Sequence, residues 1–273
     1  MNPMKAAIIF GGVLGLAMGA ISQETVPAGT ILPVRLNISI SLKTPPGKVI
    51  TGRIMQNVWL PNGMKIRDGA KISGHVTEVR PAENRAGPRI GFRFDAVEVS
   101  KRMIPIRANL RALASFMEVD EAQIPVMGPD RGTPETAWTT RQIGGDVVFR
   151  GGGPVKEGGL LVGKPVYDGV LGFTYSSAAG KCRGVVQGNN RPQALWLFSA
   201  DACGIYGMPH VKIAHAGRSD PMGEIMLNSN RPNLKIPSGS GMLLRVIGAD
   251  DAKDDASGSH ASAGNINLRP LGQ

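Results

Sequence analysis

Residues 31–42, with the sequence ILPVRLNISISL, alternate between apolar and polar side chains over most of their length. A repeat of two predicts a β-strand with one buried face, because successive side chains of a strand point to opposite sides. The residues predicted to face the core are Leu32, Val34, Leu36, Ile38, Ile40 and Leu42. The segment therefore favours a sheet-based fold.

Further strands are predicted over residues 48–60, 70–80, 89–99 and 103–107. Pro61-Asn62-Gly63 indicates a hairpin after the first of these. In the third, Ile90, Phe92 and Phe94 share one face, whereas the following valines fall on the other phase. A change of phase inside a strand predicts a β-bulge, which bends a sheet.

The second half of the chain carries a weaker pattern. Leu110, Leu113, Ala114 and Met117 recur at helical spacing, so a short helix is predicted over residues 107–122. Residues 123–145 contain many Pro and Gly and predict a long loop. Short strands are predicted at 146–149, 160–162, 169–175, 182–186, 194–199, 211–214, 223–227 and 242–247.

One short pattern occurs three times. VPAGTILPVRL at 26–36 matches IPSGSGMLLRV at 236–246 and, less closely, IRDGAKISGHV at 66–76. Each copy has an apolar residue, a Gly three positions later, a small residue and then a strand, and the Gly permits a turn with positive φ. Because the first and last copies bracket the folded part, we expect their strands to be neighbours that close the sheet on itself.

These patterns predict an all-β fold, mainly antiparallel, forming a closed or partly open β-barrel or sandwich with one short helix and long loops. The predicted β-barrel-like domain spans residues 23–248. It is divided into a first half (23–106), a helix and loop insertion (107–145) and a second half with a disulfide (146–248). Residues 249–273 lack apolar periodicity and predict a disordered tail.

The first residues resemble a cleavable signal peptide over residues 1–22. Lys5 precedes an uncharged apolar run over residues 6–20, and small residues at Ala20 and Ser22 suit cleavage before Gln23. The run is shorter than the roughly 20 residues that span a bilayer, although an uncleaved anchor is the alternative. The prediction is therefore export to the periplasm or the medium.

Two cysteines, Cys182 and Cys203, are predicted to form a disulfide after export. The alternative is a reactive thiol, because Asp201, His210 and His215 lie near in sequence. The net charge of +10 favours anionic polymers, lipid headgroups or acidic protein surfaces as partners, with simple solubility as the alternative. The basic residues form no nucleic-acid-binding motif, so no nucleic acid is expected as a partner.

The segments VPAGTILPVRLNISISLKTPPGKVITGRIMQNVW, IRDGAKISGHVTEV and NLKIPSGSGMLLRVI resemble the C-terminal β-barrel of the TrbI family, the conjugation and type IV secretion scaffold. The resemblance implies an envelope β-barrel with possible outer-membrane association. The family also has an inner-membrane helix and a Pro-rich span before the barrel and an apolar helical pair for its pore. These features find no match in this sequence.

The search for chemistry gives three weak candidates. Arg150, Gly151, Gly152, Gly153 and Lys156 form a possible anion loop, with an ordinary hairpin as the alternative. His210 and His215 are five apart, which in a strand places them on opposite faces and disfavours a metal site. A possible ligand or partner surface comprises Asn189, Asn190, Arg191, Trp196, Phe198 and Tyr206, whose aromatic members are otherwise core residues.

No motif for hydrolysis is present, and no cofactor is implied. The leading hypothesis is an exported, non-enzymatic structural or interaction protein of the envelope with a TrbI-like β-barrel. The second is a binding module for anionic cell-wall or surface polysaccharide. The third is a secreted hydrolase or a thiol enzyme that uses Cys203 with His215.

Overall fold

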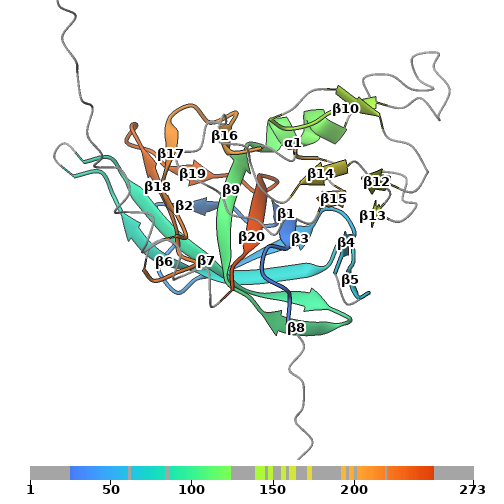
Figure 1. The fold of residues 1–273 in the computed structure, drawn as a ribbon. Helices are drawn as coiled ribbons and strands as arrows, with labels where there is room; N and C mark the ends of the chain where they lie inside the picture. The colour runs from blue at the N-terminus through green and yellow to red at the C-terminus, as the bar shows by residue number, and fades with distance from the viewer. Residues whose placement is uncertain are drawn as a thin grey trace, which may run out of the picture.

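The computed structural model describes residues 25–60, 63–83, 86–123, 139–144, 147–149, 155–157, 160–163, 171–173, 192–194, 197–199, 202–218 and 220–248. The predicted signal peptide, the predicted tail and the predicted strand at 182–186 lie outside these residues. Figure 1 shows one large, strongly curved sheet with a single helix and a group of small hairpins beside it.

Ten strands form the large sheet, in the order β16-β9-β20-β1-β3-β6-β7-β18-β17, with β8 also paired to β7. Their bounds are β1 Ile31–Leu36, β3 Val49–Ile54, β6 Lys71–Arg80, β7 Arg89–Val99, β8 Arg102–Pro105, β9 Ala108–Ala114, β16 Gly204–Tyr206, β17 Val211–Ala216, β18 Ile225–Ser229 and β20 Gly241–Val246.

The other elements are short. The remaining strands form two-stranded sheets. These are β2 Ile40–Ser41 with β19 Lys235–Ile236, β4 Val58–Trp59 with β5 Lys65–Ile66, β10 Thr139–Arg141 with β11 Val147–Phe149, β12 Val155–Glu157 with β13 Leu160–Gly163, and β14 Leu171–Phe173 with β15 Pro192–Ala194. The helix α1 is Phe116–Gln123. Of the pairings between the strands that the structure describes, only that of β16 with β9 is parallel, so the mainly antiparallel all-β class is confirmed.

The three copies of the glycine pattern form the same corner. In each, the small residue donates its N–H to the carbonyl oxygen three positions back in the turn, as Thr30 does to Pro27 at 3.2 Å. The glycines at the third position have φ of 83°, 76° and 86° at Gly29, Gly69 and Gly239. This hydrogen bond and glycine position are those of a type II turn. The corners start β1, β6 and β20.

The strands that follow the first and last copies are neighbours, as predicted. β1 and β20 are antiparallel, with Val34 opposite Met242. The predicted closure is wrong, however, because this junction lies in the middle of the sheet and the two outermost strands, β16 and β17, are not paired. The sheet is therefore curved but not closed into a barrel.

The predicted bulge in β7 is confirmed. Gly74 of β6 is opposite Phe94 and Ser73 is opposite Ala96, so Asp95 is the extra residue. Its carboxylate accepts hydrogen bonds from His75 Nδ1 at 2.7 Å and from Arg93 Nε at 2.8 Å. The inserted residue changes the phase of the strand, and both apolar sets are thereby buried in one core.

The helix predicted over residues 107–122 is wrong in its first half, which forms β9. Leu243 of β20 is opposite Ala112 and Leu244 is opposite Leu110, so Arg111 is an extra residue in β9. This bulge places Leu110 and Leu113 on the same face at a spacing of three, which imitates a helical repeat. The helix begins only after Ser115, whose Oγ accepts a hydrogen bond from the N–H of Glu118 at 3.3 Å.

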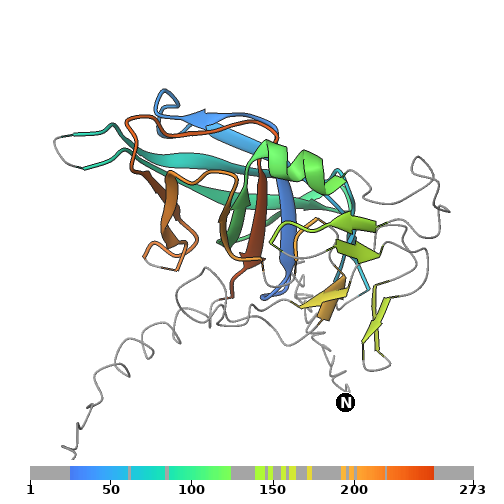
Figure 2. The same cartoon turned by 90° about the horizontal axis from the view of Figure 1, so that it is seen from above.

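Two apolar clusters lie on opposite faces of the central strands. The main cluster fills the concave side of the sheet and includes Leu32 and Met242. The second cluster includes Ile31, Leu243, Val119 and Phe198, and it packs α1 against the other face. Figure 2 shows α1 near one end of β1, β9 and β20. These strands are consequently buried on both faces.

Candidate functional site

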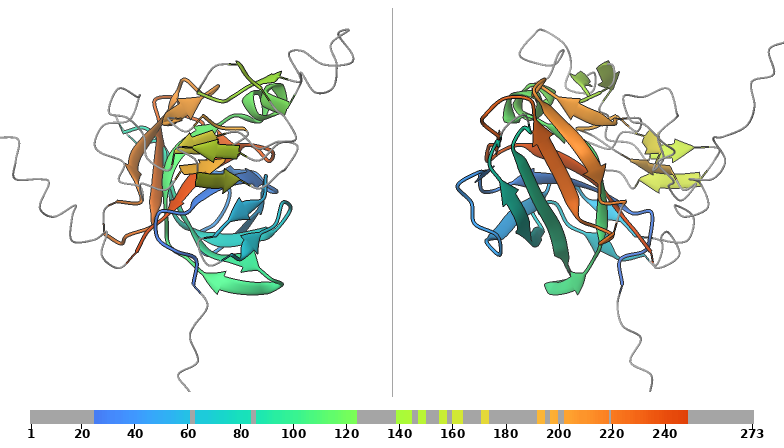
Figure 3. Two further views of the ribbon diagram at one scale, coloured as in Figure 1. Left: turned by 45° about the vertical axis from the view of Figure 1, so that its right-hand side comes forward. Right: turned by 90° about the vertical axis from the view of Figure 1, so that its left-hand side faces the viewer.

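The most distinctive opening in the sheet is the seam between its two outermost strands. Within the described residues, β17 pairs only with β18, and β16 pairs with β9 only from Ala112 onward. Figure 3 shows how the sheet curves round to bring the orange strands β17 and β18 to the side of the green β9. The seam is thus bordered by an edge of β17 and by the first half of β9.

The strands meet closely at one end of the seam. A Cβ atom added to Gly217, just after β17, would lie 2.9 Å from Asn109 Oδ1 and 3.1 Å from the carbonyl oxygen of Ala108. Gly217 has φ of 85°, and the turn that follows leads into β18. The absence of a side chain here lets the chain approach β9 without pairing with it.

Two bulges explain why the seam does not close. In β17, Ile213 is opposite Leu227 and His215 is opposite Met226, so Ala214 is an extra residue. In β9 the extra residue is Arg111. A bulge shifts the hydrogen-bonding groups of its strand out of register. Because both facing strands carry one, their edges do not present matching ladders.

A cleft of about 810 Å³ lies in the seam. Apolar side chains from three strands line it, together with the cationic Lys212 and Arg218, and the described part of its lining contains no carboxylate. The lining residues used below are Leu110, Ile205, Ile213, Lys212, His215 and Arg218. The cleft therefore combines an apolar floor with a basic rim.

Two buried polar atoms lie on the strands that border this cleft. His215 Nδ1 on β17 and Asn109 Oδ1 on β9 have no hydrogen-bond partner among the described residues, and Asn109 is only 8% exposed. A buried polar atom without a partner costs about 1–3 kcal/mol. Such atoms therefore favour a site that receives hydrogen bonds from another molecule.

The predicted aromatic surface is not assembled as a surface in the described part of the chain. Phe198 is 1% exposed and belongs to the second apolar cluster, which agrees with the alternative that it is a core residue. Tyr206 is half-buried, and its hydroxyl donates to the carbonyl oxygen of Cys203 at 3.1 Å. Asn189, Asn190, Arg191 and Trp196 lie outside the described residues.

Cys203 is disulfide-bonded and 1% exposed, so it offers no thiol for catalysis in this state. Cys182, the other cysteine of the chain, lies outside the described residues. His210 and His215 form no group of metal-binding side chains, and none occurs elsewhere in the described chain.

Arg150 and the three glycines of the possible anion loop also lie outside the described residues, and Lys156 is placed only as part of β12. The anion loop and most of the predicted aromatic surface thus stay predictions, because their residues lie outside the part of the chain that the structure describes. The residues that sequence reasoning missed are Asn109, Leu110, Ile205, Lys212, Ile213 and Arg218.

No family model matches the chain, and no curated protein is significantly similar to it. Among the residues that the structure describes, no helix has the length and apolar character needed to cross a membrane.

Proposed function

We propose that this protein is an exported, non-enzymatic interaction module of the cell envelope that binds an extended segment of a partner protein along the seam of its sheet. The observation that carries the proposal is the pair of facing strand edges, β17 and the first half of β9, which border one cleft without pairing with each other. Exposed edges are templates for an added strand.

The chemistry of the cleft favours an acidic partner segment with alternating apolar side chains. Backbone groups of an added strand would pair with the edge, and every second side chain would enter the apolar floor at Leu110 and Ile213. The cationic side chains of Lys212 and Arg218 would face carboxylates on the partner. His215 Nδ1, which belongs to a residue of the cleft lining, would gain a hydrogen bond there.

The predicted signal peptide over residues 1–22 supports placing this activity in the periplasm or the medium. The resemblance to the TrbI barrel supports an envelope role, since the three glycine corners that carry the resemblance form equivalent turns. An envelope scaffold acts by holding other proteins, which is consistent with a seam that takes a strand.

The test is the binding of two synthetic peptides to the full-length exported protein. One alternates Val and Glu, and the other alternates Val and Lys. Lys212→Glu reverses one charge at the seam, and Ala214→Pro removes an edge N–H at a residue that has no partner in β18. Lys71→Glu, an exposed charge reversal on β6, is the matched control.

We expect the acidic peptide alone to bind, with backbone amide NMR shifts concentrated in β17 and β9. Lys212→Glu should weaken binding about fivefold, since 1 kcal/mol corresponds to roughly that factor, and Ala214→Pro should weaken it further. Lys71→Glu should have no effect. Binding that survives both seam variants, or that places its shifts elsewhere, would contradict the proposal.

A further inference from the structure

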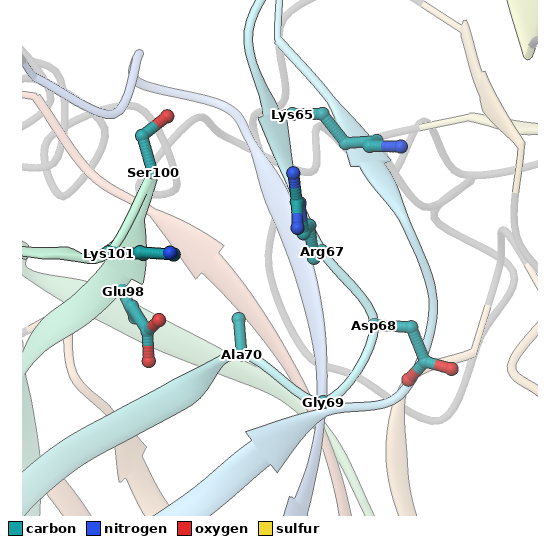
Figure 4. Close-up of a pocket in the computed structure, with 8 residues that line it drawn as sticks. All are labelled: Lys65, Arg67, Asp68, Gly69, Ala70, Glu98, Ser100 and Lys101. Atoms are coloured by element: carbon teal, nitrogen blue, oxygen red, sulfur yellow. The ribbon is translucent and has the colours of Figure 1, made fainter.

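A second pocket, of about 520 Å³, lies between two turns on a different part of the sheet. Figure 4 shows Glu98, Ser100 and Lys101 on one side, at the hairpin that joins β7 to β8, and Arg67, Asp68 and Ala70 on the other. In this view the Asp68 carboxylate is turned away from Glu98. The pocket shares no lining residue with the seam.

The hairpin side of the pocket is held in an unusual backbone conformation. Val99 pairs with Arg102, so Ser100 and Lys101 alone make the turn, and their φ angles are 50° and 67°. A two-residue turn with both φ positive favours Asn-Gly, because other side chains are strained there. Strain of this kind is concentrated at functional sites. Here it fixes a lysine at the rim of the pocket.

The opposite side is a fixed turn. Ala70 donates its N–H to the carbonyl of Arg67 at 3.1 Å, and Gly69 donates to the carbonyl of Ile54 at 2.8 Å. The N–H of Asp68 donates to Asn57 Oδ1 at 3.2 Å. These bonds place Arg67 on a rigid support, so an anion bound there would not have to order the loop.

The charges in the pocket are available to a ligand. Within the described residues, Arg67, Lys101 and Glu98 form no ion pair with any protein group. Lys65, at the outer rim, is held 4.7 Å from the centre of the Trp59 ring by a cation–π contact. The pocket therefore presents three cationic groups around one inward carboxylate.

We propose that this pocket binds an anionic sugar unit, independently of the peptide-binding seam. A phosphate or carboxylate of the sugar would accept hydrogen bonds from Arg67 and Lys101, whose charges make such bonds strong. Glu98 and Ser100 would bind sugar hydroxyls, and Glu98 would disfavour anions that have no hydroxyls to offer. The cavity volume suits one or two sugar rings.

The experiment measures binding of four probes to the full chain by NMR: glucose 1-phosphate, glucuronate, inorganic phosphate and glucose. The variants are Arg67→Ala, Lys101→Gly and Glu98→Gln, with Lys71→Ala as a control for net charge. Lys101→Gly is informative because glycine adopts a positive φ without strain, so this variant should be thermally more stable than the wild type. A loss of binding in a more stable variant cannot be caused by unfolding.

We expect glucose 1-phosphate and glucuronate to bind at low salt and to shift amides at 65–70 and 98–101. Arg67→Ala and Lys101→Gly should each weaken binding at least tenfold, whereas Lys71→Ala should not. Glu98→Gln should reduce the difference between the affinity for glucose 1-phosphate and the affinity for inorganic phosphate. Equal binding of inorganic phosphate to the wild type, an equal loss in Lys71→Ala, or no binding of either sugar anion at low salt would overturn the proposal.

Discussion

Gly29 donates its backbone N–H to the carbonyl oxygen of Val246 at 2.8 Å, and the N–H of Val246 in turn donates to Thr30 at 2.9 Å. This reciprocal pair fastens the corner before β1 to the end of β20. The same arrangement joins Gly239 to Leu36 and Gly69 to Ile54, again at 2.8 Å. Each corner therefore anchors the start of one strand to the end of its neighbour.

Two of the three corners should differ in the free energy of unfolding that the same Gly→Ala substitution costs. Gly69→Ala should destabilise the protein by about 1 kcal/mol, the typical penalty of positive φ for a residue with a Cβ atom, because no atom lies within 4 Å of the added methyl group. Gly239→Ala should cost more, since its methyl group would lie 3.2 Å from Phe116 Cβ. Urea unfolding measures both.

Gly69→Asn is the control for this comparison, because Asn tolerates the left-handed region better than Ala. It should recover part of the stability that Gly69→Ala loses. Equal stability of the two alanine variants would show that the contact with Phe116 relaxes at no cost.

The glycine corners also mark how far sequence reasoning reaches. A turn that needs glycine at one position and a strand of period two are local requirements, so the repeated pattern predicted the pairing of β1 with β20. Closure is not local, because it depends on the accumulated twist of every strand and on both sheet edges. The bulges at Ala214 and Arg111 leave those edges mismatched.

The same limit explains the error in residues 107–122. A strand buried on both faces loses its polar alternation, and the bulge at Arg111 sets Leu110 and Leu113 three residues apart on one face. The bulge at Asp95 was predictable because apolar side chains mark both phases of β7 clearly. The seam had no such signal, since its residues come from β9, β16 and β17 and meet only in the folded sheet.

Gly74 should be the least replaceable of the glycines in the sheet interior. An added Cβ would lie 1.9 Å from the carbonyl oxygen of Arg93 and 2.7 Å from Phe94 Cα, both in the backbone of β7. Because backbone cannot rotate away, Gly74→Ala should destabilise the protein by about 3 kcal/mol or more, within the range for severe overpacking. Chemical denaturation at equilibrium measures the loss.

Gly47→Ala is the matched control, because Gly47 has φ of 80° but no atom within 4 Å of an added Cβ. It should cost only about 1 kcal/mol. If Gly74→Ala lowered the free energy of unfolding no more than Gly47→Ala, the prediction would be contradicted. The backbones of β6 and β7 would then move apart at little cost, despite their paired register.

Substitutions of Phe198 and Tyr206 should lower the free energy of unfolding by different amounts, although both are aromatic residues in the second half of the chain. Phe198→Ala should cost about 3–5 kcal/mol, because it removes a side chain buried among Val119 and its neighbours. Tyr206→Phe should cost about 2 kcal/mol, roughly 1 kcal/mol for each of two typical hydrogen bonds, because the hydroxyl donates to the Cys203 carbonyl and accepts from the Cys203 N–H. Thermal unfolding of the two variants gives the comparison, and a mild Phe198→Ala would favour the ligand-surface hypothesis instead.

The oxidation state of Cys203 provides the last prediction. Since Cys203 is disulfide-bonded and Cys182 is the other cysteine of the chain, thiol titration of the unfolded, non-reduced protein should find no thiol. Two should appear after reduction. Reduction should lower the free energy of unfolding by about 3 kcal/mol, the entropy cost that a cross-link of roughly 20 residues imposes on the unfolded chain.

The double variant Cys182→Ser and Cys203→Ser distinguishes a disulfide that only stabilises the fold from a thiol that acts in catalysis. It should match the reduced protein in stability and should still bind the acidic peptide, because Cys203 is not among the described residues that line the seam. One titratable thiol before reduction would mean that Cys203 bonds to a second molecule, and a thiol reactive in the native protein would revive the thiol-enzyme hypothesis.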